Sequence, residues 1–270
     1  MIKWQQILVG CVAVALAAGG ATVARATDRG QQRIAPQSAG AQPAARGDGA
    51  TESRYRPISP CRIVDTRVGG GSLKPAKKRY FNVLGAGANF AAQGGQPGGC
   101  KIPAAARAVQ ATVTAVAPTG GGYLKSIGTG SVPVATFLSY GKGASTSNGG
   151  VFDICLGLCI NDIGLLAFSH STQVVIDVQG YFIPPMWVHV LGNGTIDASS
   201  RTRGAKRLTT GRYQVNFDRS IGHCGLSANP YYGGGAALVT VANQDTSAIV
   251  ATADAAGVAK DGEFYLNVSC

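Results

Sequence analysis

The stretch AVQATVTAV, residues 108–116, decides the fold class because its apolar side chains fall on every second position. Val109, Ala111 and Val113 alternate with glutamine and threonine. Successive side chains of a β-strand point to opposite faces, so this period of two predicts a strand with one face on a core. Similar runs occupy residues 80–84, 123–127, 134–140, 163–168 and 172–182.

The composition and the pattern downstream extend this expectation to the whole chain. The 39 glycines and the low charged content of 14% are typical of turn-rich β structure, and 45% hydrophobic residues are enough for sizeable cores. Pro184-Pro185 interrupts the pattern, and alternation resumes at residues 212–217 and 264–270. We predict an all-β chain with two disulfide-stapled domains of β-sandwich or jelly-roll-like type, residues 53–184 and 187–270.

Residues 1–26 have the pattern of a secretory signal peptide. Lys3 precedes an apolar run without charges at residues 7–23, and a small-x-small sequence ends at Ala26, where we predict cleavage. Two alternatives stay open: the apolar run remains as an uncleaved anchor, or Cys11, at the end of a lipobox-like LVGC, is lipidated.

The segment that follows, residues 27–52, has the composition of a flexible linker. It contains no aromatic residue and is rich in alanine, glycine, glutamine, proline and arginine. Such a segment cannot bury enough apolar surface to offset the entropy of ordering, which predicts disorder.

The cysteines indicate an oxidising compartment. Of seven cysteines, one lies in the predicted signal peptide, and the remaining even number suits three disulfides in a secreted or cell-surface protein, periplasmic or extracellular. Spacing favours the pairs Cys61 with Cys100, Cys155 with Cys159, and Cys224 with Cys270. Spacing alone leaves other connectivities open, and no second cysteine pair or His-x-x-x-His accompanies them to form a zinc site.

The sequence holds no complete catalytic motif. Asp65-Thr66 resembles the setting of an aspartic-protease carboxylate, but Arg67 replaces the glycine and no second such motif supplies the dyad. His170 lies close to Asp177 in sequence, without the Gly-x-Ser-x-Gly elbow of a serine hydrolase. Spacing leaves a glycosidase carboxylate pair open, with Asp153 and Asp162 as the nearest candidates. We therefore expect no catalytic residue, no metal and no cofactor, with a secreted hydrolase as the remaining enzymatic alternative.

A structural role explains the acidic residues more simply. Asp65 can cap a turn or pair with Arg62 or Arg67, because a carboxylate beside a guanidinium forms charge-assisted hydrogen bonds. Asp177 lies in the apolar run VVIDVQGYF, where a carboxylate needs a fixed partner. We expect Asp65 or Asp177 to engage an arginine of its own domain.

Basic and aromatic residues supply the candidates for binding. The net charge is +11, with basic residues concentrated in residues 54–79 and 201–212. In an exported protein this favours acidic glycans or envelope polymers over nucleic acid, with a membrane contacted only through the signal segment if it is uncleaved. Tyrosines could stack on sugar rings, although strand aromatics are equally suited to the core. The candidate ligand contacts are Lys77, Lys78, Arg79, Tyr231 and Tyr232.

Two segments also resemble known modules. Residues 54–182 resemble a module of secreted bacterial proteins that opens with Pro-x-Arg-x-x-Asp-Thr-Arg and closes with Asp-Val-x-Gly-Tyr-Phe. The residues that carry this likeness are Pro60, Arg62, Asp65, Thr66, Arg67, Asp177, Val178, Gly180, Tyr181 and Phe182. Residues 187–270 are similar to a C-terminal β module of bacterial surface proteins that ends Phe-x-Leu-x-Val-x-Cys.

These likenesses imply a role at the bacterial surface. They imply a non-enzymatic exported protein that acts in structure, adhesion or assembly, and the second module loosely resembles heads that form trimers. The alternative is a module that binds glycans or envelope polymers.

Overall fold

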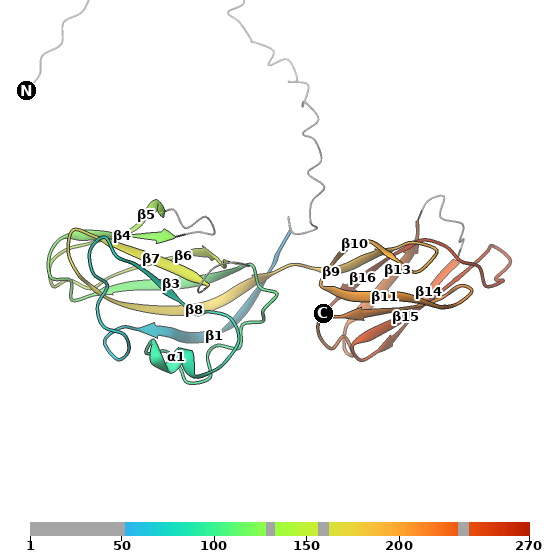
Figure 1. The fold of residues 1–270 in the computed structure, drawn as a ribbon, viewed down its shortest axis with the longest axis horizontal. Coiled ribbons are helices and arrows are strands. Elements are labelled where there is room, and N and C mark those ends of the chain that lie inside the picture. The colour runs from blue at the N-terminus through green and yellow to red at the C-terminus, as the bar shows by residue number, and fades with distance from the viewer. Residues whose placement is uncertain (1–51, 128–132, 156–161, 232–237) are drawn as a thin grey trace, which may run out of the picture. The chain divides into compact units, whose positions relative to one another are not determined.

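The computed structural model describes residues 52–127, 133–155, 162–231 and 238–270. These residues belong to one compact unit, Arg46–Cys270. They form four antiparallel four-stranded sheets, two before Pro184 and two after Pro185, and no strand of one half enters a sheet of the other (Figure 1). The predicted all-β fold with two disulfide-stapled domains is therefore confirmed.

The first domain is a sandwich of two sheets. One sheet has the order β1-β8-β3-β6 and the other β2-β7-β4-β5. The strands of the first sheet are β1 (Arg54–Asp65), β8 (Gln173–Ile183), β3 (Ala108–Val116) and β6 (Thr146–Asp153). Those of the second are β2 (Lys78–Phe81), β7 (Ile163–Phe168), β4 (Gly122–Ile127) and β5 (Pro133–Tyr140).

The alternating pattern of residues 108–116 gives one buried and one partly exposed face, as predicted from the sequence. Along β3, Val109, Ala111, Val113 and Ala115 are fully buried, and the residues between them are partly exposed. Their side chains enter one core together with the apolar side of β8 and residues of β4 and β7. The other predicted strands of this domain are also present, with ends that differ by at most three residues.

One short helix was not predicted from the sequence. Helix α1 (Ala88–Ala92) has five residues and lies beside β1 (Figure 1). Phe90 is its buried residue, and the buried side-chain amide of Gln93, just after the helix, donates to the carbonyls of Ile63 and Asn82. The helix is thus fixed by tertiary contacts. Nowhere in the described ranges is a helix long and apolar enough to span a membrane.

The second domain repeats the two-sheet plan. Its sheets have the orders β10-β9-β16-β13 and β11-β12-β15-β14. The first contains β10 (Ile196–Ser200), β9 (Met186–Val190), β16 (Phe264–Ser269) and β13 (Gly225–Pro230). The second contains β11 (Thr202–Thr209), β12 (Arg212–Phe217), β15 (Ser247–Ala253) and β14 (Leu238–Gln244). Phe264, Leu266 and Val268 alternate with exposed residues and fill the core with Tyr213 and Val215.

Asp261 ties the edge of this domain to its core. Its carboxylate accepts hydrogen bonds from Arg207 Nε at 2.8 Å, from the Gly211 amide at 2.8 Å and from the Tyr213 hydroxyl at 3.2 Å. The Arg207 hydrogen bond, followed by the Gly211 amide, lowers the pKa of Asp261 to about 2. The ionised carboxylate is therefore part of the folded state.

Two predicted disulfides are present. Cys61 is bonded to Cys100 and Cys224 to Cys270, so each domain carries at least one staple. Cys155 is also disulfide-bonded, whereas Cys159, its predicted partner, lies outside the described residues. Such bonds are typical of an oxidising environment outside the cytoplasm.

Removing the staple of the second domain should destabilise it. The Cys224–Cys270 bond spans 46 positions of sequence. Closing a loop of that size restricts the unfolded chain, so replacing both cysteines by alanine should lower the free energy of unfolding by about 2–5 kcal/mol. Urea titration followed by Trp187 fluorescence measures this change. An unchanged midpoint would contradict it.

Asp261 should give the second domain an acid-sensitive component of stability. Because its pKa is lower in the folded than in the unfolded state, the carboxylate stabilises the fold above pH about 4, and this contribution is lost as the pH falls towards about 2. Asp261→Asn should flatten the dependence of unfolding on pH in this window. Asp153→Asn, in the other domain, is the control, and Trp187 fluorescence in urea is the readout.

Candidate functional site

Asp65 is a scaffold residue held by two arginines. Its side chain is 6% exposed and accepts hydrogen bonds from Arg67 Nε at 2.8 Å and Arg67 Nη2 at 2.6 Å. Its Oδ1 also accepts the Arg67 amide at 3.1 Å, which caps the turn after β1. Arg62 approaches the other oxygen at 3.5 Å. The Arg67 side-chain hydrogen bonds are the main cause that lowers the pKa of Asp65.

Asp177 is engaged by the same arginine cluster. Arg62 donates from Nε and Nη2 to its two carboxylate oxygens at 2.9 and 3.1 Å, across the β1-β8 pair in which the two residues are direct partners. The structure thus places both predicted acidic residues on arginines of their own domain. Next to them, the Thr66 hydroxyl accepts the Val174 amide at 2.7 Å and joins β8 to the same turn.

The closing motif of the first domain has a packing role. Gly180 in β8 lies under Tyr55, and a Cβ at this position would come within 2.4 Å of the Tyr55 hydroxyl oxygen. Tyr55 also packs on Phe182 with 5.2 Å between ring centroids. Tyr181, on the opposite face of β8 from Gly180, is partly buried. These residues therefore hold β1 on β8.

The arrangement of His170 contradicts a serine-hydrolase triad with Asp177. The His170 Nδ1 lies 2.8 Å from the Gly121 carbonyl, while Asp177 is occupied by Arg62. Asp162, named in sequence as a possible glycosidase acid, accepts the amides of Val83 and Leu84 at 2.5 and 2.7 Å. Within the described ranges, no three His, Cys, Asp or Glu side chains converge as metal ligands.

The predicted ligand contacts do not form one site. Lys77, Lys78 and Arg79 lie at β2 in the first domain, and Arg79 is turned inward, donating to the Gly71 carbonyl and covering the Phe81 ring at 5.2 Å. Burial lowers the pKa of Arg79. Tyr231 follows β13 in the second domain and is 41% exposed.

Three other aromatic residues are either outside the described residues or buried in the core. Tyr232 lies outside the described residues. Phe81 and Tyr140, two aromatic residues of strands in the first domain, are core residues at 1% and 5% exposure. Tyr231 is therefore the described tyrosine of the predicted set that remains exposed for contact.

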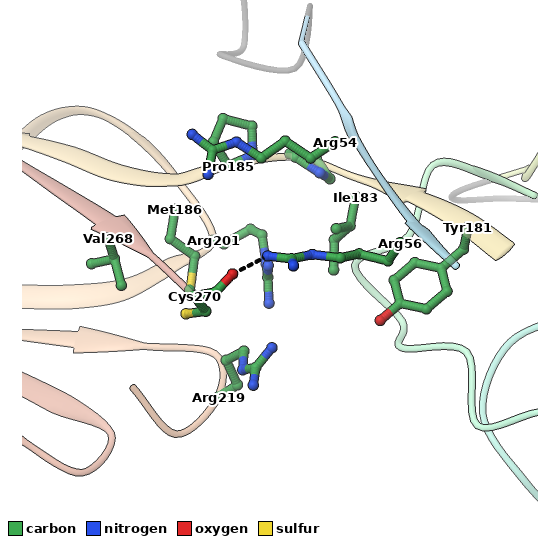
Figure 2. Close-up of a pocket in the computed structure, with 11 residues that line it drawn as sticks. Arg54, Arg56, Tyr181, Ile183, Pro185, Met186, Arg201, Arg219, Val268 and Cys270 are labelled. Atoms are coloured by element: carbon green, nitrogen blue, oxygen red, sulfur yellow. Dashed lines mark hydrogen bonds between the residues drawn. The ribbon is translucent and has the colours of Figure 1, made fainter. Parts of the chain in front are cut away.

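A different cluster of basic residues surrounds a small pocket where the chain passes from β8 to β9. Figure 2 shows Arg54 and Arg56 of β1 near Arg201 and Arg219 of the second domain. Pro184, Pro185 and the apolar side chains of Ile183 and Met186 also line this pocket. Its volume is about 30 Å³, which matches a water-sized or small ionic group.

A second pocket adjoins the first and shares Tyr181, Ile183, Arg201 and Arg219 with it. Its volume is about 320 Å³, at the lower end of the range for small-molecule sites. We call the two pockets together the basic groove. The basic residues that line the groove are Arg54, Arg56, Lys101, Arg201, Arg203 and Arg219.

The groove carries a strong excess of positive charge. Among the described residues, Asp218 is the only acidic side chain that lines either pocket, and Arg201 neutralises it through two hydrogen bonds of 2.9 Å. Arg56 donates to the main-chain oxygen of Cys270, drawn as the dashed line in Figure 2, and Arg219 Nε donates to the Ser220 carbonyl at 3.1 Å. The Ser220 carbonyl orients the Arg219 guanidinium without removing its charge.

Two basic residues of the groove have backbones in the left-handed region. The φ angles are 60° at Arg201 and 56° at Lys101. For residues with a Cβ this conformation costs about 1–2 kcal/mol and persists only where neighbouring contacts hold it. At Arg201 the ion pair with Asp218 supplies such a contact, and the Arg201 side chain is only 9% exposed. The position of Arg201 is therefore fixed before any ligand arrives.

The sequence indicated four of the basic residues of the groove but not that they lie close together in the fold. Arg54 and Arg56 belong to one predicted basic segment, and Arg201 and Arg203 to the other. Lys101 and Arg219 lie in neither and were missed. No local periodicity links these positions, because they meet only through the packing of β8, β9 and the turns around them.

Comparison with known proteins found no matching family model, no similar curated protein and no similar solved structure. The resemblance of both halves to bacterial surface modules therefore stays a prediction.

Replacing Arg67 should destabilise the first domain. Arg67→Ala leaves the buried Asp65 carboxylate without its two closest side-chain donors, and the temperature of unfolding should fall. Arg67→Lys keeps a charge but not the forked geometry, so its effect should be intermediate. Differential scanning calorimetry measures both. Unchanged unfolding of Arg67→Ala would show that Arg62 alone suffices.

Proposed function

We propose that this protein is a non-enzymatic exported surface protein whose basic groove binds acidic glycans or envelope polymers. The observation that carries the proposal is the lining of the groove, which contains six basic side chains and one acidic side chain. That carboxylate, Asp218, is already paired with Arg201. Arg54, Lys101, Arg203 and Arg219 are left for an external anion.

The sizes of the two pockets suit different parts of an acidic polymer. The smaller one, at about 30 Å³, has room for a single charged group such as a carboxylate or phosphate between Arg54, Arg56 and Arg219. The adjoining one, at about 320 Å³, has room for a ring beside Tyr181 and Lys101. A polymer with a negative charge on each repeating unit would place a charged group in the smaller pocket and a neighbouring ring in the larger one.

The chemistry of the groove favours binding over turnover. Its one carboxylate is held by an arginine, so it offers no free acid or base for proton transfer. Arginine forks match carboxylate and phosphate oxygens in planar, bidentate geometry. The disulfides and the predicted signal peptide support an exported setting, where acidic envelope polymers are the abundant anions.

The proposal is tested with polymers of defined charge. Binding of the full-chain protein to fluorescent polygalacturonate, poly(glycerol phosphate) and neutral dextran is measured by anisotropy at several salt concentrations. We expect binding to one or both acidic polymers, weakening as salt rises, and none to dextran. The two acidic arms distinguish a carboxylate source from a phosphate source.

Matched variants locate the site. Arg54→Ala with Arg219→Ala should weaken binding of the acidic polymer by about a hundredfold or more, because each lost charged hydrogen bond contributes about 1.5–3 kcal/mol. Lys142→Ala with Lys260→Ala removes the same charge from exposed positions outside the groove and should have little effect. Equal losses of affinity in both double variants would mean that the overall positive charge of the protein, and not the groove, attracts the polymer. No binding, with stable trimers in light scattering, would favour a structural role.

A further inference from the structure

We propose that the outer face of the β10-β9-β16-β13 sheet is a second binding site, for an uncharged polysaccharide. This site is separate from the basic groove and does not depend on its function. Its centre consists of Tyr231, Tyr265 and His189, which we call the aromatic face. Tyr231 and Tyr265 are 41% and 38% exposed, unusually large fractions for aromatic side chains at a sheet.

The strand register brings polar side chains around these rings. Tyr265 of β16 pairs with His189 of β9 on one side and with Asn229 of β13 on the other. Two residues further along the same face, Asn267 pairs with Trp187 and Ser227. Because side chains two residues apart share a face, the rings and the amides point the same way. Amide and hydroxyl groups beside an aromatic ring are suited to sugar hydroxyls.

The three rings are packed as a unit. The His189 ring is stacked on Tyr265 with 4.5 Å between centroids and a 20° interplanar angle. Tyr231 lies 4.7 Å from His189 and 5.8 Å from Tyr265. This packing limits the motion of both tyrosines, so little rotamer entropy is lost when a sugar ring stacks on them.

His189 supplies an unsatisfied polar atom at the centre of the face. The residue is 5% exposed, and its Nδ1 lies 3.0 Å from Asp197 Oδ2. Its Nε2 is buried without a hydrogen-bond partner, 3.7 Å from Glu263 Oε2. A buried polar atom left unpaired costs about 1–3 kcal/mol. His189 therefore lies under the tyrosine rings as their support and is not itself a ligand contact.

The same geometry excludes other occupants. Ring centroids only 4.5–5.8 Å apart leave no space between them for a quaternary ammonium group, so the rings do not form a cage for cations. The charged side chains that face His189 are the carboxylates of Asp197 and Glu263, which would repel an acidic polymer. An uncharged, hydroxyl-rich ring can stack on the exposed tyrosines and donate its hydroxyl groups to the nearby carboxylates.

The test uses neutral oligosaccharides and the tryptophan that the register places on this face. The full-chain protein is titrated with chitohexaose, cellohexaose and maltohexaose by isothermal calorimetry, with Trp187 fluorescence as a local readout. We expect one of the three to bind and to change the fluorescence. Tyr231→Ala and Tyr265→Ala should each weaken binding about three- to tenfold, as expected for loss of one stacked ring.

Control variants separate stacking from folding and from the groove. Tyr231→Phe keeps the ring and should retain binding, and Tyr55→Ala removes a tyrosine of similar exposure, 43%, in the other domain and should not change it. Arg54→Ala with Arg219→Ala should bind the hexaose normally even if acidic polymers no longer bind. No binding of any hexaose up to about 1 mM, or equal losses in Tyr55→Ala and Tyr265→Ala, would overturn the proposal.

Discussion

The antiparallel pairing of β1 with β8 is the constraint on which the rest of the structure depends. It joins the beginning of the first domain to its last strand, and Arg62 and Asp177 form a forked ion pair across it. The same register places Arg54 opposite Ile183, at the end of β8 that leads into the second domain. The pairing therefore both closes the first sandwich and sets the position of the basic groove.

The two proposed sites have opposite chemistry. The basic groove collects guanidinium and ammonium groups around one neutralised carboxylate, whereas the aromatic face combines tyrosine rings, amides and two carboxylates. The carboxylates of the aromatic face would repel an acidic polymer, and an uncharged polymer has no charge for the basic groove to attract. A protein with both could hold an acidic and a neutral polymer at the same time, a property suited to adhesion within an envelope that contains both.

Much of the fold could be predicted from the sequence because burial follows the period of two, as in residues 108–116. Helix α1 could not, since its five residues are held by the contacts of Phe90 and Gln93 rather than by local pattern. The partners of Asp65 and Asp177 were foreseeable from charge and proximity. The groove and the His189 cluster were not, because they depend on the register of strands distant in sequence.

The Cys224–Cys270 bond also alters how the second domain would bear mechanical load. A pull on the chain at Cys270 would pass through the sulfur atoms to Cys224, next to β13. The chain between them, with a sequence separation of 46 and an extended length of roughly 160 Å, would carry no tension. Strands β13, β14, β15 and β16 and both tyrosines of the aromatic face lie in this protected loop, so a bound polymer could be pulled without stretching that part of its site.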